Sequence, residues 1–158
     1  MSTRFQPEPY HTLTPALTVA DGAGVAAIEF YQKAFAAKET MRLMHQGKLA
    51  HAELRIGDSV VMLGEEMPEM GFTSPTTLGG TCGGLMLYVP DADKVVAQAV
   101  AAGAKPLGEV QDQFYGDRSG SVRDPFGYRW TIATHTEDLS EEEVQRRFTE
   151  FTSAHATA

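Results

Sequence analysis

The sequence contains very little cysteine and no long apolar run. Cys82 is the one cysteine, so an intrachain disulfide is excluded, and a small packed or loop residue in a reducing compartment is the simplest interpretation. No apolar stretch is long enough to span a bilayer, and residues 1–10 lack the apolar core of a signal peptide. These features predict a cytoplasmic protein without a membrane partner.

The sequence also lacks an excess of positive charge. Its 13 basic and 21 acidic residues give a formal charge of −8 at pH 7. Nucleic acids and anionic membranes attract basic surfaces, so this balance argues against both as partners. The chain of 158 residues is 42% hydrophobic and 22% charged, which is ordinary for a globular protein of one domain.

Residues 115–132 carry a clear β-hairpin pattern. Asp124-Pro125-Phe126-Gly127 fits a turn, since proline presets φ and glycine tolerates a positive φ. Apolar and polar residues alternate after it, so Trp130 points to one face while Arg129 and Thr131 point to the other. The apolar face is expected to pack under a helix, and the polar face can line a cavity.

The first half begins with a predicted strand over residues 11–20, with Leu13 and Leu17 on its apolar face, and a helix over residues 23–38. A short strand is expected over residues 39–45. We interpret the glycines in residues 20–24 as a loop insertion, because the third glycine of a dinucleotide fingerprint and the lysine of a P-loop are missing.

Residues 51–56 alternate as a strand that puts His51 and Glu53 on its polar face. Residues 57–58 fit a two-residue hairpin turn, and residues 59–63 form the returning strand. With that turn, Glu53 faces Met62, and facing residues share one side of a sheet.

A long loop over residues 65–82 then separates two halves of the chain, and such loops are typically lids or linkers. The second half starts with a strand whose less apolar face carries Met86 and Tyr88. Asp91 fits the N-cap of a helix that ends at Gly103. A weaker strand over residues 106–114 precedes the hairpin, so each half reads β-α-β-β-β. A capping box at Ser140 opens a final helix.

Five sequence runs carry a resemblance to a known family. They are Ile28-Glu-Phe-Tyr31, His51-Ala-Glu-Leu54, Tyr115-Gly-Asp-Arg-Ser-Gly120, Asp124-Pro-Phe-Gly-Tyr-Arg-Trp130 and Trp130-Thr-Ile-Ala-Thr-His135. Together they resemble the vicinal-oxygen-chelate superfamily, which is the glyoxalase/bleomycin-resistance/dioxygenase group, and its PhnB-like branch in particular. The resemblance covers roughly residues 10–137. It is specific for the fold and not for a reaction, because this fold hosts many activities.

The resemblance implies an α+β fold of two βαβββ modules that form cup-shaped sheets around a cavity, with a C-terminal helix added. We expect a single domain over residues 1–158. Its parts are module one at about 11–66, a loop at 67–82, module two at about 83–136 and the helix at about 140–153.

The resemblance also implies where a metal would bind. Metal enzymes of the superfamily place one ligand on the first and one on the last strand of each module. The matching positions are Thr14, Met62, Gly84 and Thr131. None of them offers the imidazole, carboxylate or thiolate that divalent metals prefer. We therefore expect no metal and no other cofactor.

The candidate site residues are polar or methionine side chains expected near the cavity. His51 and Glu53 are candidates for acid/base catalysis. Glu53 could instead form a structural ion pair with Arg55, Arg118 or Arg129. The full set of candidate ligand-binding residues is His51, Glu53, Met62, Met86, Tyr88, Tyr115, Arg118, Arg129 and Thr131. Tyr115 and Arg118 could equally form a solvated hairpin edge, and the methionines could be core residues.

Three functions remain open on the sequence alone. The first is binding of an unidentified small molecule, with sequestration or metal-independent catalysis. The second is a metal-dependent lyase, isomerase or dioxygenase that uses a displaced site at His51 and Glu53. The third, a methyltransferase using adenosylmethionine, is disfavoured by the missing nucleotide loop. A homodimer is expected, because the cups are open and the last helix has an apolar stripe.

Overall fold

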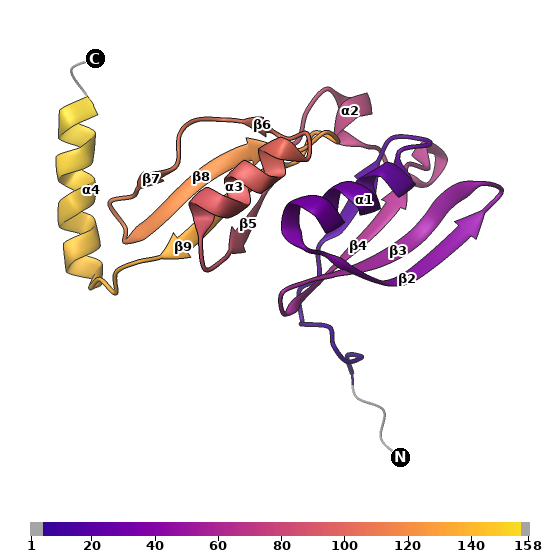
Figure 1. Cartoon of the computed structure of the whole chain (residues 1–158), viewed down its shortest axis with the longest axis horizontal. Helices are drawn as coiled ribbons and strands as arrows, with labels where there is room; N and C mark the ends of the chain where they lie inside the picture. Colours follow the sequence, from indigo (N-terminus) through magenta and orange to yellow (C-terminus); the bar gives the residue numbers. More distant parts are fainter. Residues whose placement is uncertain (1–4, 156–158) are drawn as a thin grey trace.

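The computed structural model describes residues 5–155. The chain forms a four-stranded sheet in the order β1-β4-β3-β2 and a five-stranded sheet in the order β5-β9-β8-β6, with β7 also paired to β8. The two sheets lie side by side along the long axis of the molecule, and α1 and α3 cover the same side of them (Figure 1). The predicted α+β fold of two repeated modules with a C-terminal helix is confirmed.

The elements follow the predicted order in both modules. Module one contains β1 (Ala16–Val19), α1 (Gly24–Phe35), β2 (Lys38–His45), β3 (Lys48–Ile56) and β4 (Ser59–Glu65). Module two contains β5 (Gly84–Tyr88), α3 (Ala92–Ala101), β6 (Lys105–Pro106), β7 (Gln111–Asp112), β8 (Asp117–Arg123) and β9 (Arg129–His135). Between them lie η1 (Pro68–Met70) and α2 (Pro75–Leu78), and α4 (Glu141–His155) follows the second module.

Two predicted strands were wrong in extent. The first strand starts at Ala16 rather than at residue 11, and Leu13, expected on the apolar face, is 86% exposed. Pro15 has no N–H to donate, which accounts for the late start. The strand expected over residues 106–114 is two strands of two residues each, because Pro106 and Gly108, which has a φ of +147°, interrupt the pairing.

One continuous core joins the two modules. Helices α1 and α3 pack against each other, and the aromatic side chains of α1 meet those of the β8–β9 hairpin. The rings of Phe35 and Trp130 lie 4.6 Å apart between centroids. Burial of such large rings on both sides of the module boundary stabilises the modules as one unit.

The buried carboxylate of Asp124 fixes the turn that the sequence predicted. Its Oδ2 accepts hydrogen bonds from the Tyr31 hydroxyl at 2.7 Å and the Trp130 indole at 2.9 Å. Its Oδ1 accepts from the backbone N–H groups of Phe126 and Tyr128, each at 2.9 Å. Burial raises the pKa of Asp124, and these four donors oppose the rise. The Asp-Pro-Phe-Gly run is therefore structural.

A second buried carboxylate explains the glycines before α1. Glu65, at the end of β4, accepts from the N–H of Gly22 at 2.9 Å and of Gly24 at 3.0 Å. A Cβ on Gly24 would lie 2.6 Å from Oε1 of Glu65, so only glycine fits there. An internal carboxylate thus occupies the N–H groups that a nucleotide phosphate would need, in agreement with the loop interpretation.

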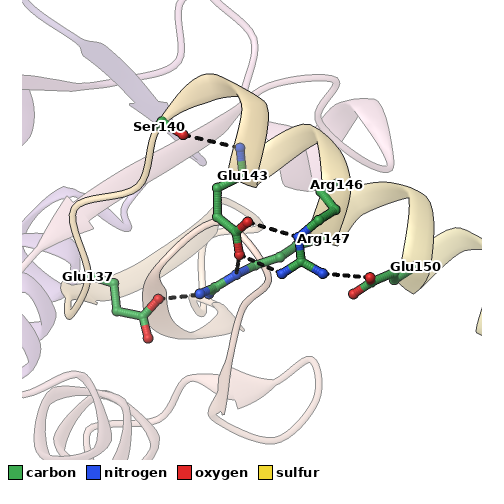
Figure 2. Close-up of polar contacts among 6 residues, drawn as sticks. All are labelled: Glu137, Ser140, Glu143, Arg146, Arg147 and Glu150. Carbon is green, nitrogen blue, oxygen red and sulfur yellow. Dashed lines mark hydrogen bonds and ion pairs between the residues drawn. The ribbon is translucent and has the colours of Figure 1, made fainter.

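Helix α4 stands at the far end of module two (Figure 1). The Ser140 Oγ accepts from the N–H of Glu143 at 3.3 Å, which confirms the predicted N-cap. The carboxylate of Glu143 bonds Arg146 and Arg147, and Arg147 also reaches Glu137 (Figure 2). On the apolar side, Phe148 and Phe151 pack on Phe114, yet each remains 45% exposed. Among residues 5–155, no helix is long and apolar enough to cross a membrane.

Candidate functional site

The face of module one opposite α1 brings three predicted residues together. The β3–β4 register pairs Glu53 with Met62 and Ile56 with Ser59, as the two-residue turn predicted. His51, two residues before Glu53, lies on the same face as Glu53 and Met62 because side chains alternate along a strand. A cavity of about 290 Å³ opens beside this face, and Ala16, Thr18, His51, Met62, Met67 and Phe72 are among its lining residues. Met67 and Phe72 come from the long loop, so that loop borders the cavity.

Glu53 has no arginine partner among the described residues, which removes the ion pairs considered from the sequence. Its Oε1 lies 3.5 Å from Nε2 of His51, and its side chain is 18% exposed. The Tyr10 hydroxyl bonds the same carboxylate. Burial raises the pKa of Tyr10 to about 12, with a further contribution from the Glu53 charge and hydrogen bond. The carboxylate therefore sits among polar, partly exposed groups rather than in a buried ion pair.

The face of module two opposite α3 carries the other predicted set. Strand β5 pairs with β9 so that Met86 lies beside Thr131 and Gly84 beside Arg129. Met86 is 48% exposed and Tyr88 60% exposed, so neither is a core residue. A cavity of about 550 Å³ opens here, and Met86, Arg129 and Thr131 contribute to its lining.

A hydrogen-bonded network at the other end of this face was not predicted. Asp117, whose side chain is 4% exposed, accepts from the Tyr88 hydroxyl at 2.9 Å and lies 2.8 Å from Nδ1 of His135. Nε2 of His135 lies 3.0 Å from Asp138. These bonds to Asp117 and then Asp138 raise the pKa of His135, and the bond to Asp117 raises the pKa of Tyr88.

Arg118 is a predicted site residue that the structure places elsewhere. It pairs with Thr134 on the helix side of the sheet. Its guanidinium bonds Asp93 of α3 at 2.6 Å and Asp112 at 3.1 Å. Arg118 was grouped with the cavity as a side chain that could hold a ligand, although residues 115–120 belong to the predicted hairpin. They enter strand β8, whose alternation with the buried Val122 puts Arg118 on the α3 side.

Tyr115 lies just before β8, and its ring packs edge-on against Phe114, with 5.1 Å between centroids. The bond to Asp117 and burial raise the pKa of Tyr88, and an electrostatic interaction with Tyr115 adds to the rise. Tyr115 is not among the residues that line the 550 Å³ cavity.

The predicted residues therefore form two groups within one chain. The module-one group is His51, Glu53 and Met62, and the module-two group is Met86, Tyr88, Arg129 and Thr131. The 290 Å³ and 550 Å³ cavities share no lining residue. A third cavity, of about 450 Å³, lies between the modules and contacts Met86 and Tyr88 on one side and the Ile56–Ser59 turn on the other.

The positions that matched the metal ligands do not fit a divalent ion. Thr14 lies ahead of β1, where its hydroxyl donates to the His11 carbonyl at 3.3 Å. Met62 and Thr131 lie in β4 and β9, and Gly84 has no side chain. Within residues 5–155, no three His, Cys, Asp or Glu side chains gather as a metal site would require. His51 and Glu53 alone give a displaced site only two donors.

The comparisons with known proteins agree with this architecture. Residues 13–132 match the family model of the Glyoxalase/Bleomycin resistance protein/Dioxygenase superfamily. The chain belongs to this superfamily. An uncharacterized protein of Mycobacterium bovis is 42% identical over 137 residues, which cover 84% of this chain and 89% of that protein.

Solved structures extend the likeness to the fold of the superfamily. A gene product of Arabidopsis thaliana is 28% identical and has a TM-score of 0.64, with 78% of this chain and 98% of that chain covered. A Bacillus cereus PhnB protein, described as a putative 3-demethylubiquinone-9 3-methyltransferase, has a TM-score of 0.61. The likeness covers 78% of this chain and 99% of that chain. Because the two sequences are only 15% identical, it shows the PhnB-like fold alone.

Sequence reasoning missed Tyr10, Asp117 and His135. Asp117 and His135 could have been found by extending the β8–β9 hairpin outward from its turn, because that register pairs them directly. Tyr10 had no usable signal, since it lies in an irregular segment before β1.

Proposed function

We propose that this superfamily member binds a small molecule on the sheet faces opposite α1 and α3, which we call the concave faces, without the metal site of its metal-dependent relatives. The observation that carries the proposal is the chemistry of these faces. Threonine, methionine and glycine stand at the metal positions, while partly exposed polar and methionine side chains border cavities of about 290 and 550 Å³. Cavities of this size suit small organic molecules.

The side chains at the two cavities suit recognition of a molecule with both apolar and polar parts. Met62 and Met86 are flexible, polarizable walls that adapt to irregular shapes. The imidazole of His51, the hydroxyl of Thr131 and the guanidinium of Arg129 offer hydrogen-bonding groups at these cavities. Glu53 adds a carboxylate beside His51. Binding of this kind serves sequestration, and the acid/base pair at His51 and Glu53 would allow metal-independent proton transfer.

A metal-dependent lyase, isomerase or dioxygenase with a displaced site is the alternative. Its support is the pairing of His51 with Glu53 at 3.5 Å on the concave face. Two protein donors fall short of the three that catalytic metal sites typically supply. The proposal of metal-independent binding is therefore favoured.

We propose further that the protein is a homodimer. Met41 pairs with Glu53 and Leu43 with His51, so both lie on the concave face of module one, where they are 43% and 55% exposed. These exposed apolar side chains border the polar groups of Glu53 and His51. A two-fold pair would cover these side chains and could join the two cavity groups across the interface. Sedimentation at micromolar concentration tests this, and a monomer would contradict it.

The binding proposal is tested by NMR of methyl-labelled methionine in the presence of a library of small molecules. Binding on the concave faces should shift the methyl signals of Met62 or Met86. Met44, which is 47% exposed, pairs with the buried Leu49 and lines neither cavity, serves as the internal control and should not move. A library that shifts neither Met62 nor Met86, or shifts Met44 alone, would contradict the proposal.

A further inference from the structure

Three basic residues form a row across the concave face of module two. Strand pairing places Lys105 of β6 beside Arg123 of β8, and Arg123 beside Arg129 of β9. Residues that face each other across strands share one side of the sheet. Arg129 and Thr131 lie on the side opposite α3, and Arg123 and Arg129 of the row line the same cavity as Thr131.

The row has no internal counter-charge. Among the described residues, Lys105, Arg123 and Arg129 form no ion pair, and the one side-chain hydrogen bond of the row joins Arg129 to the Ser121 hydroxyl at 3.4 Å. Elsewhere in the chain, Arg42, Arg118, Arg146 and Arg147 all bond carboxylates. Like charges directly opposite each other destabilise a sheet. Because the row lacks an internal counter-charge within residues 5–155, its donors are available to an anion from outside the chain.

The adjoining cavity is shaped to receive that anion. Its volume is about 550 Å³, and its lining comprises the Gly80–Gly84 loop, Leu85, Met86, Arg123, Arg129 and Thr131 without any carboxylate. A Cβ on Gly80 or Gly83 would meet no atom within 4 Å, so the loop backbone is open to the cavity. The hydroxyls of Thr81 and Thr131 add neutral hydrogen-bonding groups beside the two guanidinium groups.

We propose that this row is an oxyanion subsite that holds the carboxylate or phosphate group of the small molecule bound by module two. Guanidinium groups match both oxyanions because each presents a fork of N–H donors. The rest of the molecule would lie over Thr131 and Met86, toward Tyr88. This inference rests on the proposed function and adds the chemical class of the ligand to it.

The test compares anionic probes with a neutral probe of the same shape. Inorganic phosphate and benzoate represent the two oxyanions, and benzamide is the neutral counterpart of benzoate. Binding is followed by NMR of the arginine side chains and the Met86 methyl group at constant ionic strength. Arg123→Gln and Arg129→Gln remove the proposed contacts. Lys94→Gln is the control, because it removes one positive charge from the helix that covers the other side of the same sheet.

The wild-type protein and Lys94→Gln should bind phosphate or benzoate more tightly than benzamide. Each arginine variant should weaken anion binding by about tenfold or more, the effect expected for loss of a charge-assisted hydrogen bond. Stronger binding of phosphate than benzoate would assign the subsite to phosphate compounds, and the reverse order to carboxylates. Anion binding that is equal in wild type and both arginine variants, or not detected at all, would overturn the subsite.

The melting temperature provides a second readout that does not depend on the choice of organic probe. Because the like charges repel, Arg123→Gln should leave the melting temperature unchanged or raise it, whereas phosphate should raise it only when Arg123 is present. A lower melting temperature for Arg123→Gln, with the phosphate effect retained, would also overturn the subsite. If the subsite is overturned but neutral molecules still shift the Met86 methyl signal, the proposed small-molecule site is retained.

Discussion

The substitution Glu53→Gln separates a site residue from a scaffold residue. Glu53 lies 3.5 Å from a partly exposed His51, and such pairs contribute about 0–1 kcal/mol to stability. Glutamine keeps an acceptor oxygen for the Tyr10 hydroxyl, so most of that hydrogen bond is retained. We therefore expect the free energy of unfolding to fall by less than about 1.5 kcal/mol. A fully buried ion pair would instead cost roughly 3–5 kcal/mol.

Two assays measure this prediction. Trp130 is the single tryptophan and is 3% exposed, so its fluorescence reports unfolding in urea. NMR of ring-labelled tyrosine follows Tyr10, whose pKa should fall from about 12 yet stay above 10.0, because burial is the larger cause of its shift. Glu29→Gln, on the exposed side of α1, is the control for loss of one negative charge.

The same variant should weaken binding of a small molecule that shifts the Met62 methyl signal, whereas the control should not. A loss of roughly 3 kcal/mol or more in unfolding free energy, with ligand binding unchanged, would refute the assignment of Glu53 to the site.

Two further predictions concern the hydrogen-bonded carboxylates. Tyr31→Phe removes a buried hydroxyl that donates to Asp124 at 2.7 Å, so urea unfolding should show a loss of about 1.5–3 kcal/mol, and a loss below about 0.5 kcal/mol would contradict the structural role of Asp124. The pKa of His135 is raised above 6.5 in the folded protein, so its stabilising contribution is complete below that value and is lost as pH rises through the folded-state pKa. Urea unfolding at a series of pH values should show this decline in wild type and a flatter profile in His135→Gln, and identical profiles would contradict the network.

The alternation of apolar and polar residues predicted much of the fold. It gave the faces of β3, β5 and β9, and the two-residue turn gave the pairing of Glu53 with Met62. These predictions hold because the period of two and the turn length are local properties of the chain. The early start given to β1 failed, because Pro15 ends the pairing and the segment before it leaves the sheet.

The sequence predicted only part of the candidate site. Which face a residue takes follows from its strand, so Met86 and Thr131 were placed correctly. Arg118 was not, because the alternation was followed after the turn of the hairpin and not back along β8. The contact of Tyr10 with Glu53 depends on the path of an irregular segment, which no sequence period describes. The unpaired row of Lys105, Arg123 and Arg129 needed the cross-strand register of three strands at once.

Metal content distinguishes a metal-independent binding protein from a metal-dependent enzyme. The protein would be purified without a histidine tag, dialysed separately against zinc, manganese, iron(II) and nickel salts, and analysed by mass spectrometry for bound metal. We predict well below one equivalent of any metal per chain, and small-molecule binding at Met62 or Met86 that EDTA does not change. One retained equivalent that disappears in both His51→Gln and Glu53→Gln would contradict this prediction and establish the displaced metal site.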